Sequence, residues 1–243
     1  MALHDGAAAR RFPGPDFYAV LEWIHDALNP ETYVEIGVLN GDSLRLAQPP
    51  TIAVGIDPNA VWEGVRIFRL SSSEFFAHHD LRKVLGGRSV DFALVDGLHV
   101  FEQAIDDLFN LERYAGPGTV IALHDTIPLD RETSARNRRT EFYTGDVWKV
   151  LPFLRSYRPD LEMITVATAP TGLTLIRHCD CERDNTSILE RIAEFAGLDF
   201  DYFERHCTEF LALMPNERSV VQAFCQYTPV QSIVRSGAVI PSR

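Results

Sequence analysis

The stretch LEMITVATAPTGLTLIRH, residues 161–178, decides the fold. Two apolar runs rich in β-branched residues, 161–168 and 172–178, are separated by only three residues, Ala169-Pro170-Thr171. A link of that length is too short for a crossover helix, so the two strands must pair as an antiparallel hairpin. We therefore expect the sheet of this protein to end in an antiparallel pair.

Upstream of this hairpin, strand-like runs alternate with helical segments. Apolar spacing predicts a helix with one buried face at 99–115 and another at 15–28, which ends at Asn29-Pro30. A short helix is expected after Gly41, and another at 146–157. Continuous β-branched strands that alternate with helices are typical of a parallel sheet covered on both faces, an α/β fold. The expected strands before the hairpin are residues 32–38, 51–57, 65–71, 90–96 and 118–125.

Composition and charge exclude several classes of partner. The chain has 243 residues, of which 46% are hydrophobic and 23% are charged, as in globular proteins. Its formal net charge of −11 argues against sequence-independent binding to nucleic acid or to an anionic membrane. No apolar run approaches the roughly 20 residues of a membrane span, and no segment resembles a signal peptide. We expect no nucleic-acid partner, no membrane and a cytoplasmic location.

A glycine-containing turn, EIGVLNGDS (35–43), follows the first expected strand. Glycine there lets the backbone approach a ligand and turn sharply. The turn lacks G-x-G-x-x-G, and Glu35 would lie beside a pyrophosphate, so a cationic ligand without phosphate fits better. Asp57 ends the second strand 22 residues later, where an acid can accept both hydroxyls of a ribose. The alternative is that Gly37 and Gly41 serve only a tight turn.

Acidic and histidine side chains follow two neighbouring strands. Asp96 and His99 come after the fourth strand, and His124 and Asp125 end the fifth. The carboxyl ends of parallel strands meet at one edge of the sheet, so these side chains should converge. Three interpretations stay open: mutual hydrogen bonding, proton transfer by a histidine, and a divalent metal. Two carboxylates and water suit Mg²⁺, whereas an added imidazole favours Mn²⁺, Zn²⁺ or Fe²⁺.

The turn E-x-G-x-x-x-G, the acid after the second strand and the terminal hairpin together resemble class I S-adenosylmethionine-dependent methyltransferases. The resemblance covers residues 30–180. It implies a Rossmann-like, doubly wound, seven-stranded sheet with a C-terminal antiparallel hairpin, and S-adenosylmethionine as cofactor. By position, the resemblance implies cofactor contacts from Glu35, Gly37, Gly41 and Ser43 on the methionine side, Asp57 at the ribose, Ser71 and Ser72 at the adenine, and Asp96 beside the methyl group.

The motifs DG-x-H at 96–99 and HD at 124–125 are similar to a subgroup of small-molecule O-methyltransferases that includes macrocin and macrolide-sugar enzymes. That similarity implies methyl transfer to a hydroxyl of a small metabolite. It also implies His99 as the base, with Asp96 and His124 beside it, and Mg²⁺ or another divalent metal at Asp96, His124 and Asp125. His124 stands where many members have an acid. The alternatives are N-methylation of an amino sugar or amine, a metal-dependent hydroxylase-like enzyme, and a non-catalytic scaffold.

Residues 126–145 show no periodicity, and connections longer than about 12–15 residues are usually functional or disordered. The segment starts directly after His124-Asp125, so we expect it to overhang the acceptor site. Its basic residues favour a small, anionic acceptor, the alternative being a solvated loop. The residues expected to contact the acceptor are Arg131, Arg136, Arg138, Arg139 and Tyr143, with Trp148 from the following helix.

Three parts are expected along the chain: an N-terminal helical segment (1–30), a cofactor-binding methyltransferase domain (31–180) and a helical C-terminal appendage (181–243). Within the appendage, residues 187–198 and 200–214 predict helices, and 222–243 predict irregular chain. The terminal helices are compatible with a homodimer.

Four cysteines lie in the last third of the chain, two of them beside histidines. His178-Cys179-Asp-Cys181 and His206-Cys207 lack the usual C-x-x-C spacing of a zinc site. Buried thiols are therefore expected here rather than structural zinc.

Overall fold

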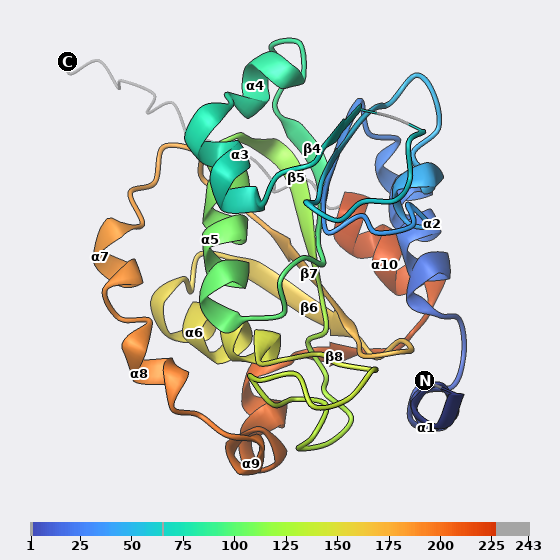
Figure 1. Cartoon of the computed structure of the whole chain (residues 1–243), viewed down its shortest axis with the longest axis vertical. Coiled ribbons are helices and arrows are strands. Elements are labelled where there is room, and N and C mark those ends of the chain that lie inside the picture. The colour runs from blue at the N-terminus through green and yellow to red at the C-terminus, as the bar shows by residue number, and fades with distance from the viewer. Residues whose placement is uncertain (1, 65, 227–243) are drawn as a thin grey trace, which may run out of the picture.

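A computed structural model of the chain describes residues 2–64 and 66–226. Its sheet has the strand order β3-β2-β1-β4-β5-β7-β6-β8 (Figure 1). The strands from β3 to β5 in this order pair in parallel, and β7 pairs antiparallel with both β5 and β6. The strands are β1 Thr32–Ile36, β2 Ile52–Ile56, β3 Arg66–Phe68, β4 Val90–Val95, β5 Ala115–His124, β6 Glu162–Val166, β7 Leu173–Arg177 and β8 Leu213–Met214.

Helices cover both faces of this sheet (Figure 1). One core lies between the sheet and α3, α5, α6 and α9, and a second lies between the sheet and α2 and α10, which contact each other. The helices are α1 Ala2–Arg11, α2 Phe17–Leu28, α3 Ser72–His78, α4 Leu81–Val84, α5 Phe101–Glu112, α6 Val150–Tyr157, α7 Thr186–Leu189, α8 Ala193–Ala196, α9 Phe200–Phe210 and α10 Arg218–Gln226, with 3-10 turns η1 Leu44–Leu46 and η2 Val147–Lys149.

The α/β fold and its terminal hairpin are confirmed. Every expected strand is present, and β6 and β7 pair in the antiparallel sense that their short link demands. The helix at 15–28 is also confirmed as α2. It begins after Asp16, whose side chain accepts a hydrogen bond from the Ala19 N–H, and ends at Asn29 in the left-handed conformation, φ 43°. Pro30 follows directly and cannot continue the helix.

Several expectations about the elements are wrong. The sheet has eight strands rather than seven, because β8 from the appendage pairs in parallel with β6. The short helix after Gly41 is a single 3-10 turn. Residues 222–226, expected to be irregular, belong to α10, whose apolar face packs on α2; residues 227–243 lie outside the described part of the chain.

A buried ion cluster, which we call the Arg158 cluster, ties α5 to the chain after α6 and to the appendage. Arg158 is fully buried and donates to both carboxylate oxygens of Glu112, at 2.8 and 2.7 Å. It also donates to Asp160, while Asn185 donates to Glu112 at 2.7 Å. Each buried charge in this cluster therefore has hydrogen-bonded partners of opposite charge.

The cysteines do not gather into a metal site among the described residues. Burial raises the pKa of both the Cys179 and the Cys225 thiol to about 12, as expected for inert buried thiols. Cys181, in contrast, is exposed. In the part of the chain that the structure describes, no helix has the length and apolar character needed to cross a membrane.

Candidate active site

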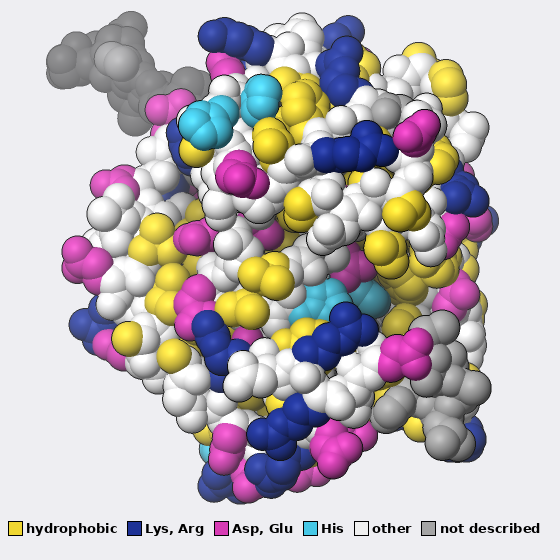
Figure 2. Space-filling model, viewed as in Figure 1, with side chains coloured by type: hydrophobic (Ala, Val, Ile, Leu, Met, Phe, Trp, Pro, Cys, Tyr) yellow, Lys and Arg dark blue, Asp and Glu magenta, His cyan; other side chains and the backbone are white. Residues whose placement is uncertain are grey.

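A large cleft opens at the carboxyl ends of β1, β2, β4 and β5. Its volume is about 1030 Å³, at the upper end of the range of about 300–1,000 Å³ usual for ligand sites, so it has room for two small molecules together. Figure 2 shows histidine side chains in the hollow at the centre of this face, with a basic side chain beside them. Of the residues expected to contact a cofactor, the cleft is lined by Gly37, Ser43, Asp57, Ser71, Ser72 and Asp96.

Glu35 and Gly41 lie outside the cleft lining, contrary to expectation. The Glu35 carboxyl is fully buried beneath the loop, where the hydroxyls of Tyr33 and Ser43 each donate to it at 2.7 Å. Burial raises the pKa of Glu35 to about 8, against the opposing effect of these two hydrogen bonds. Glu35 therefore acts on the cleft by holding Ser43.

The two glycines are explained by close contacts within the protein. Gly37 has φ 89°, and a Cβ there would lie 1.9 Å from the Asp96 carbonyl oxygen. Gly41 has φ 72°, and its Cβ would lie 2.5 Å from the Trp62 ring. A side chain at either position would displace backbone or indole atoms. The glycine turn thus lets the loops after β1 and β4 meet at the cleft.

Asp57 holds the same loop from the other side. One carboxylate oxygen accepts from the N–H groups of Val38 and Leu39, at 2.9 and 2.7 Å, and the other accepts from Asn59 N–H at 2.6 Å. A carboxylate oxygen can accept two hydrogen bonds, so the oxygen bonded to Asn59 has one acceptor position left. Because Asp57 also lines the cleft, it combines loop fixation with acceptor capacity toward a ligand.

The end of the cleft near α3 is supported by a chain of polar side chains. Ser71 caps α3 and exchanges hydrogen bonds with Glu74. Gln103 donates to Ser72 at 3.2 Å and to Asp107 at 2.8 Å. The other carboxylate oxygen of Asp107 is buried without a hydrogen-bond partner. Sequence reasoning missed Gln103 and Asp107, because they lie on α5 at ordinary helical positions.

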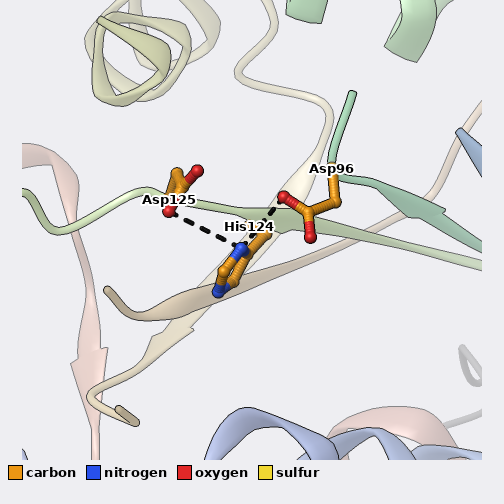
Figure 3. A group of neighbouring side chains, drawn as sticks. All are labelled: Asp96, His124 and Asp125. Carbon is orange, nitrogen blue, oxygen red and sulfur yellow. Dashed lines mark hydrogen bonds and ion pairs between the residues drawn. The ribbon is translucent and has the colours of Figure 1, made fainter. Parts of the chain in front are cut away.

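The residues after β4 and β5 converge as expected, in a group that we call the His124 cluster: Asp96, His99, His124 and Asp125. His124 Nδ1 donates to Asp96 Oδ1 at 3.0 Å and lies 3.6 Å from Asp125 Oδ1 (Figure 3). The Phe17 ring stacks on the His124 imidazole, with 4.3 Å between centroids. Thr171 donates to Asp125 Oδ1 at 2.6 Å.

His99 completes this cluster from the loop after β4. Its Nδ1 donates to the Tyr143 carbonyl at 2.8 Å and lies 3.1 Å from Asp125 Oδ2, while its Nε2 lies 3.7 Å from Asp96 Oδ1.

Burial alone would lower the pKa of His99, but the Asp125 and Asp96 carboxylates outweigh it and raise this pKa to about 9. The pKa of His124 is raised for the same reason: burial would lower it, but the charges of Asp96 and Asp125 outweigh burial. Burial would raise the pKa of Asp96, but the two histidines hold it well below its usual range.

The His124 cluster fits a divalent cation. One ligand atom from each of Asp96, His124 and Asp125 lies within 4.8 Å of the other two. Carboxylate oxygens and imidazole nitrogens are atoms that bind divalent metal ions. Asp125 Oδ2 is buried and has no hydrogen-bond partner. The Asp125 backbone has φ 61°, an uncommon conformation that is concentrated at functional sites. Apart from its ion-pair contact with His99, this oxygen has acceptor capacity that a cation bound beside the two other ligand atoms would satisfy.

The segment 126–145 does reach over the cleft, but only part of it. Arg136, Arg138 and Tyr143 line the cleft, whereas Arg131 and Arg139 lie outside its lining. Arg131 instead pairs with Asp201 of α9. Gly145, with φ 58°, brings the end of the segment against the His99 carbonyl, where a Cβ would lie 1.8 Å away.

The expectation that Trp148 faces the acceptor is wrong. Trp148 is 1% exposed and packs against Phe203 and Phe210 of α9. Its neighbour Asp146 caps α5 by accepting from the Phe101 N–H at 2.9 Å. This turn therefore anchors the segment to the core, with the indole buried against aromatic side chains of α9.

Sequence reasoning also missed the aromatic wall from the N-terminal helix. Phe17 and Tyr18 of α2 line the cleft, as do Leu39 and Leu98, which are 59% and 66% exposed. Phe17 fits the helical apolar pattern of α2, so nothing local distinguished it from a core residue. Its role follows from the packing of α2 beside β5.

Comparisons with known proteins bear on this cleft and fold. Residues 52–126 match the family described as "Methyltransferase domain". No curated protein matches the chain in sequence.

Similar solved structures include an O-methyltransferase from Bacillus cereus in complex with SAH, at 12% identity and TM-score 0.49, covering 70% of this chain and 86% of that chain. TomG, an O-methyltransferase from Streptomyces achromogenes involved in tomaymycin synthesis and solved with SAM, is 16% identical with TM-score 0.47, covering 72% and 87%. Cofactor-bound Rv0187 from MTB is 16% identical with TM-score 0.49, covering 74% and 89%.

The family match spans β2 to the end of β5, and so includes three of the four strands at whose ends the cleft lies, β1 being outside it. It coincides with the acid after β2 and the Asp-x-x-His and His-Asp pairs after β4 and β5. The mostly parallel sheet with its antiparallel hairpin is the fold that the resemblance in sequence implies. This part of the chain is therefore similar to a methyltransferase domain, and it lies within a mostly parallel α/β sheet.

Proposed function

We propose that the enzyme methylates a hydroxyl group of a small molecule, with a divalent cation at Asp96, His124 and Asp125 and with His99 as the base. The observation that carries this proposal is the His124 cluster at the floor of the cleft. Methyl transfer to a neutral amine needs no such gathering of carboxylates and imidazoles. A hydroxyl is far less acidic, so two carboxylates that can hold a cation and a histidine that can take a proton favour an oxygen acceptor.

On the cofactor side, the chain has to bind and orient. S-adenosylmethionine supplies an electrophilic methyl group, so the chemistry belongs to the cofactor. The loop at 37–43, held by Asp57 and Glu35, and the Ser72–Gln103 pair form the walls against which it would be held. Transfer requires an acceptor oxygen about 3 Å from the methyl carbon and in line with the departing sulfur, and these walls would hold the cofactor for that approach.

On the acceptor side, His99 is held in one tautomer. Its Nδ1–H donates to the Tyr143 carbonyl, so Nε2 is the nitrogen that can accept a proton. With a pKa of about 9, raised against burial by Asp125 and Asp96, this histidine is protonated at neutral pH. A cation bound at the two carboxylates would offset their charge and acidify a coordinated hydroxyl. Neutral His99 is then the proton acceptor in the cleft.

Water exclusion falls to the segment at 136–143 and to Phe17 and Tyr18. Both groups line the cleft, and four of their residues carry aromatic rings: Phe17, Tyr18, Phe142 and Tyr143. Aromatic walls remove bulk water from the reacting groups and strengthen their electrostatic interactions.

The test compares His99→Gln with the matched control His206→Gln, a partly exposed histidine of α9 paired with Glu209. Methyl transfer from S-adenosylmethionine is measured against a panel of phenols and sugars, and affinity for S-adenosylhomocysteine by calorimetry. We expect His99→Gln to lose at least about 100-fold in kcat, with unchanged cofactor affinity, and the control to match the native enzyme. Chelation should abolish turnover, and added Mg²⁺ or Mn²⁺ should restore it.

Each part of the proposal has its own contradicting result. Full turnover by His99→Gln would rule out this histidine as the base. Turnover that survives both chelation and Asp125→Asn would rule out the role of the cation. Methyl transfer to amines alone would rule out an oxygen acceptor.

A further inference from the structure

The cations that line the cleft are not equivalent. Arg136 is compensated, since its Nη1 lies 2.7 Å from Glu102 and 3.2 Å from Asp146. Arg138 has no carboxylate partner among the described residues. Its Nε and Nη2 donate to the backbone carbonyls of Thr140 and Glu141, at 3.2 and 2.6 Å. The lining of the cleft therefore includes a guanidinium whose charge the described residues leave uncompensated.

The guanidinium of Arg138 is held in place with donors to spare. Of its five N–H groups, two are used by backbone carbonyls, and those on Nη1 have no hydrogen-bond acceptor within the part of the chain that the structure describes. The group also lies over the Tyr143 ring, 5.8 Å from its centroid, a cation–π contact. Backbone bonds and the ring together fix the orientation of a planar fork that matches a carboxylate.

This arginine is connected to His99 by stacked rings. The Tyr143 and His99 rings are 5.6 Å apart at 15°, and the Arg138 guanidinium follows at 5.8 Å from Tyr143. The distance from His99 to the guanidinium cannot exceed these two spacings combined. A molecule with its hydroxyl at His99 and its anion at Arg138 is therefore short, of the length of one ring with a short substituent.

The remaining walls suit a flat molecule of low charge. Phe17 stacks on His124 and lies 4.1 Å from the Tyr18 ring, so aromatic faces flank the cluster from α2. An acid three residues further along the chain, Glu141, also lines the cleft. A cleft lined by one arginine outside carboxylate ion pairs, together with an acid, favours one negative charge over the double charge of a phosphate.

We infer that the acceptor is a flat, hydroxylated carboxylic acid whose carboxylate pairs with Arg138 while its hydroxyl reaches His99. This inference rests on the proposed function, since it names the substrate class of the same site. Of the four arginines expected to contact the acceptor, this inference assigns that contact to Arg138 alone.

The test uses three probes that differ in one group: 3,4-dihydroxybenzoate, 3,4-dihydroxybenzamide and 3,4-dihydroxyphenylphosphonate. Their binding to enzyme saturated with S-adenosylhomocysteine and Mg²⁺ is measured by calorimetry, and their methylation by product formation. The variants are Arg138→Gln and the control Arg139→Gln, the adjacent exposed arginine outside the cleft. A charge-assisted bond at a half-open site corresponds to about a tenfold preference. The native enzyme and the control should prefer the benzoate by about that factor, and Arg138→Gln should lose the preference.

The outcomes separate this inference from the proposed function. A benzoate preference that Arg138→Gln keeps, equal binding of benzoate and benzamide, a phosphonate preference, or binding of no probe each overturns the inference. If 3,4-dihydroxybenzamide and 3,4-dihydroxybenzoate are methylated at equal rates, the proposed function is supported and the carboxylate subsite at Arg138 is ruled out. Carboxylate binding that depends on Arg138, without methylation of any probe, supports the subsite and contradicts the function.

Discussion

The Arg158 cluster and the His124 cluster both bury charged side chains, but they differ in how completely those charges are paired. Arg158 and Glu112 meet through two parallel hydrogen bonds, and Asn185 occupies a further acceptor site on Glu112. In the His124 cluster, Asp125 Oδ2 is buried with no hydrogen-bond partner. A fully bonded cluster stabilises the fold, whereas an incompletely bonded one is arranged for something absent from the chain itself.

The largest effect should come from breaking the fully bonded cluster. Arg158→Ala leaves Glu112 buried and unpaired, and the free energy of unfolding should fall by about 3–5 kcal/mol. Urea denaturation measures this change. The control is Arg183→Ala, a partly exposed arginine 3.6 Å from Asp160, which should cost less than about 1 kcal/mol. Equal losses of unfolding free energy in the two variants would show that the fully bonded Arg158 cluster contributes no more to stability than a partly exposed ion pair.

A second prediction concerns Asp107, the other buried carboxylate with an unpartnered oxygen. Burial raises its pKa from 3.8 to about 6, so the folded state binds this proton more tightly than the unfolded chain. The stability that this group contributes is full below about pH 4 and declines as pH rises to about 6. The decline amounts to about 3 kcal/mol.

Asp107→Asn removes this titration. The free energy of unfolding of the native protein, relative to the variant, should therefore fall between pH 4 and pH 7. Parallel denaturation curves at the two pH values measure it, and other titrating groups cancel in the difference. A relative stability that rises with pH would show that the Asp107 carboxylate is stabilised, not strained, by burial.

The smallest change in stability is expected at Asp125, in the incompletely bonded cluster. Asn tolerates the left-handed backbone and keeps an oxygen for Thr171, so Asp125→Asn should alter the free energy of unfolding by less than about 1 kcal/mol. The pKa of His99 should fall, because Asp125 is the largest influence that raises it against burial. An NMR titration of His99 and the thermal shift with Mn²⁺ measure both consequences. A large loss of stability, with the Mn²⁺ shift retained, would make this cluster structural like the first.

Much of the fold follows from local pattern. Buried strands of a parallel sheet need continuous apolar side chains, and a three-residue link allows only a hairpin, so β1 to β7 could be placed from the sequence. β8 could not, because two residues carry no periodicity and pair only when α9 and α10 bring them to β6. For the same reason α4, of four residues, escaped prediction, and the single helix expected at 187–198 is instead two helices of four residues each, α7 and α8.

The candidate site divides along a similar line. Asp96, His99, His124 and Asp125 could be brought together from the sequence, because strand ends in a parallel sheet meet at one edge. The arginines of the segment 126–145 could not be ranked. Whether an arginine faces a ligand or a carboxylate depends on partners remote in the chain, such as Asp201 for Arg131.

The sequence by itself determined which residues end the strands, and with them the position of the cleft and the charge at its floor. Covalent order is sufficient there, since the direction and adjacency of parallel strands put those ends side by side. Only the tertiary structure decided that Trp148 fills the core, that Phe17 stacks on His124 and that Arg138 keeps an uncompensated charge. Those outcomes depend on competition among distant side chains for burial and for opposite charge, and no short stretch of sequence contains both competitors.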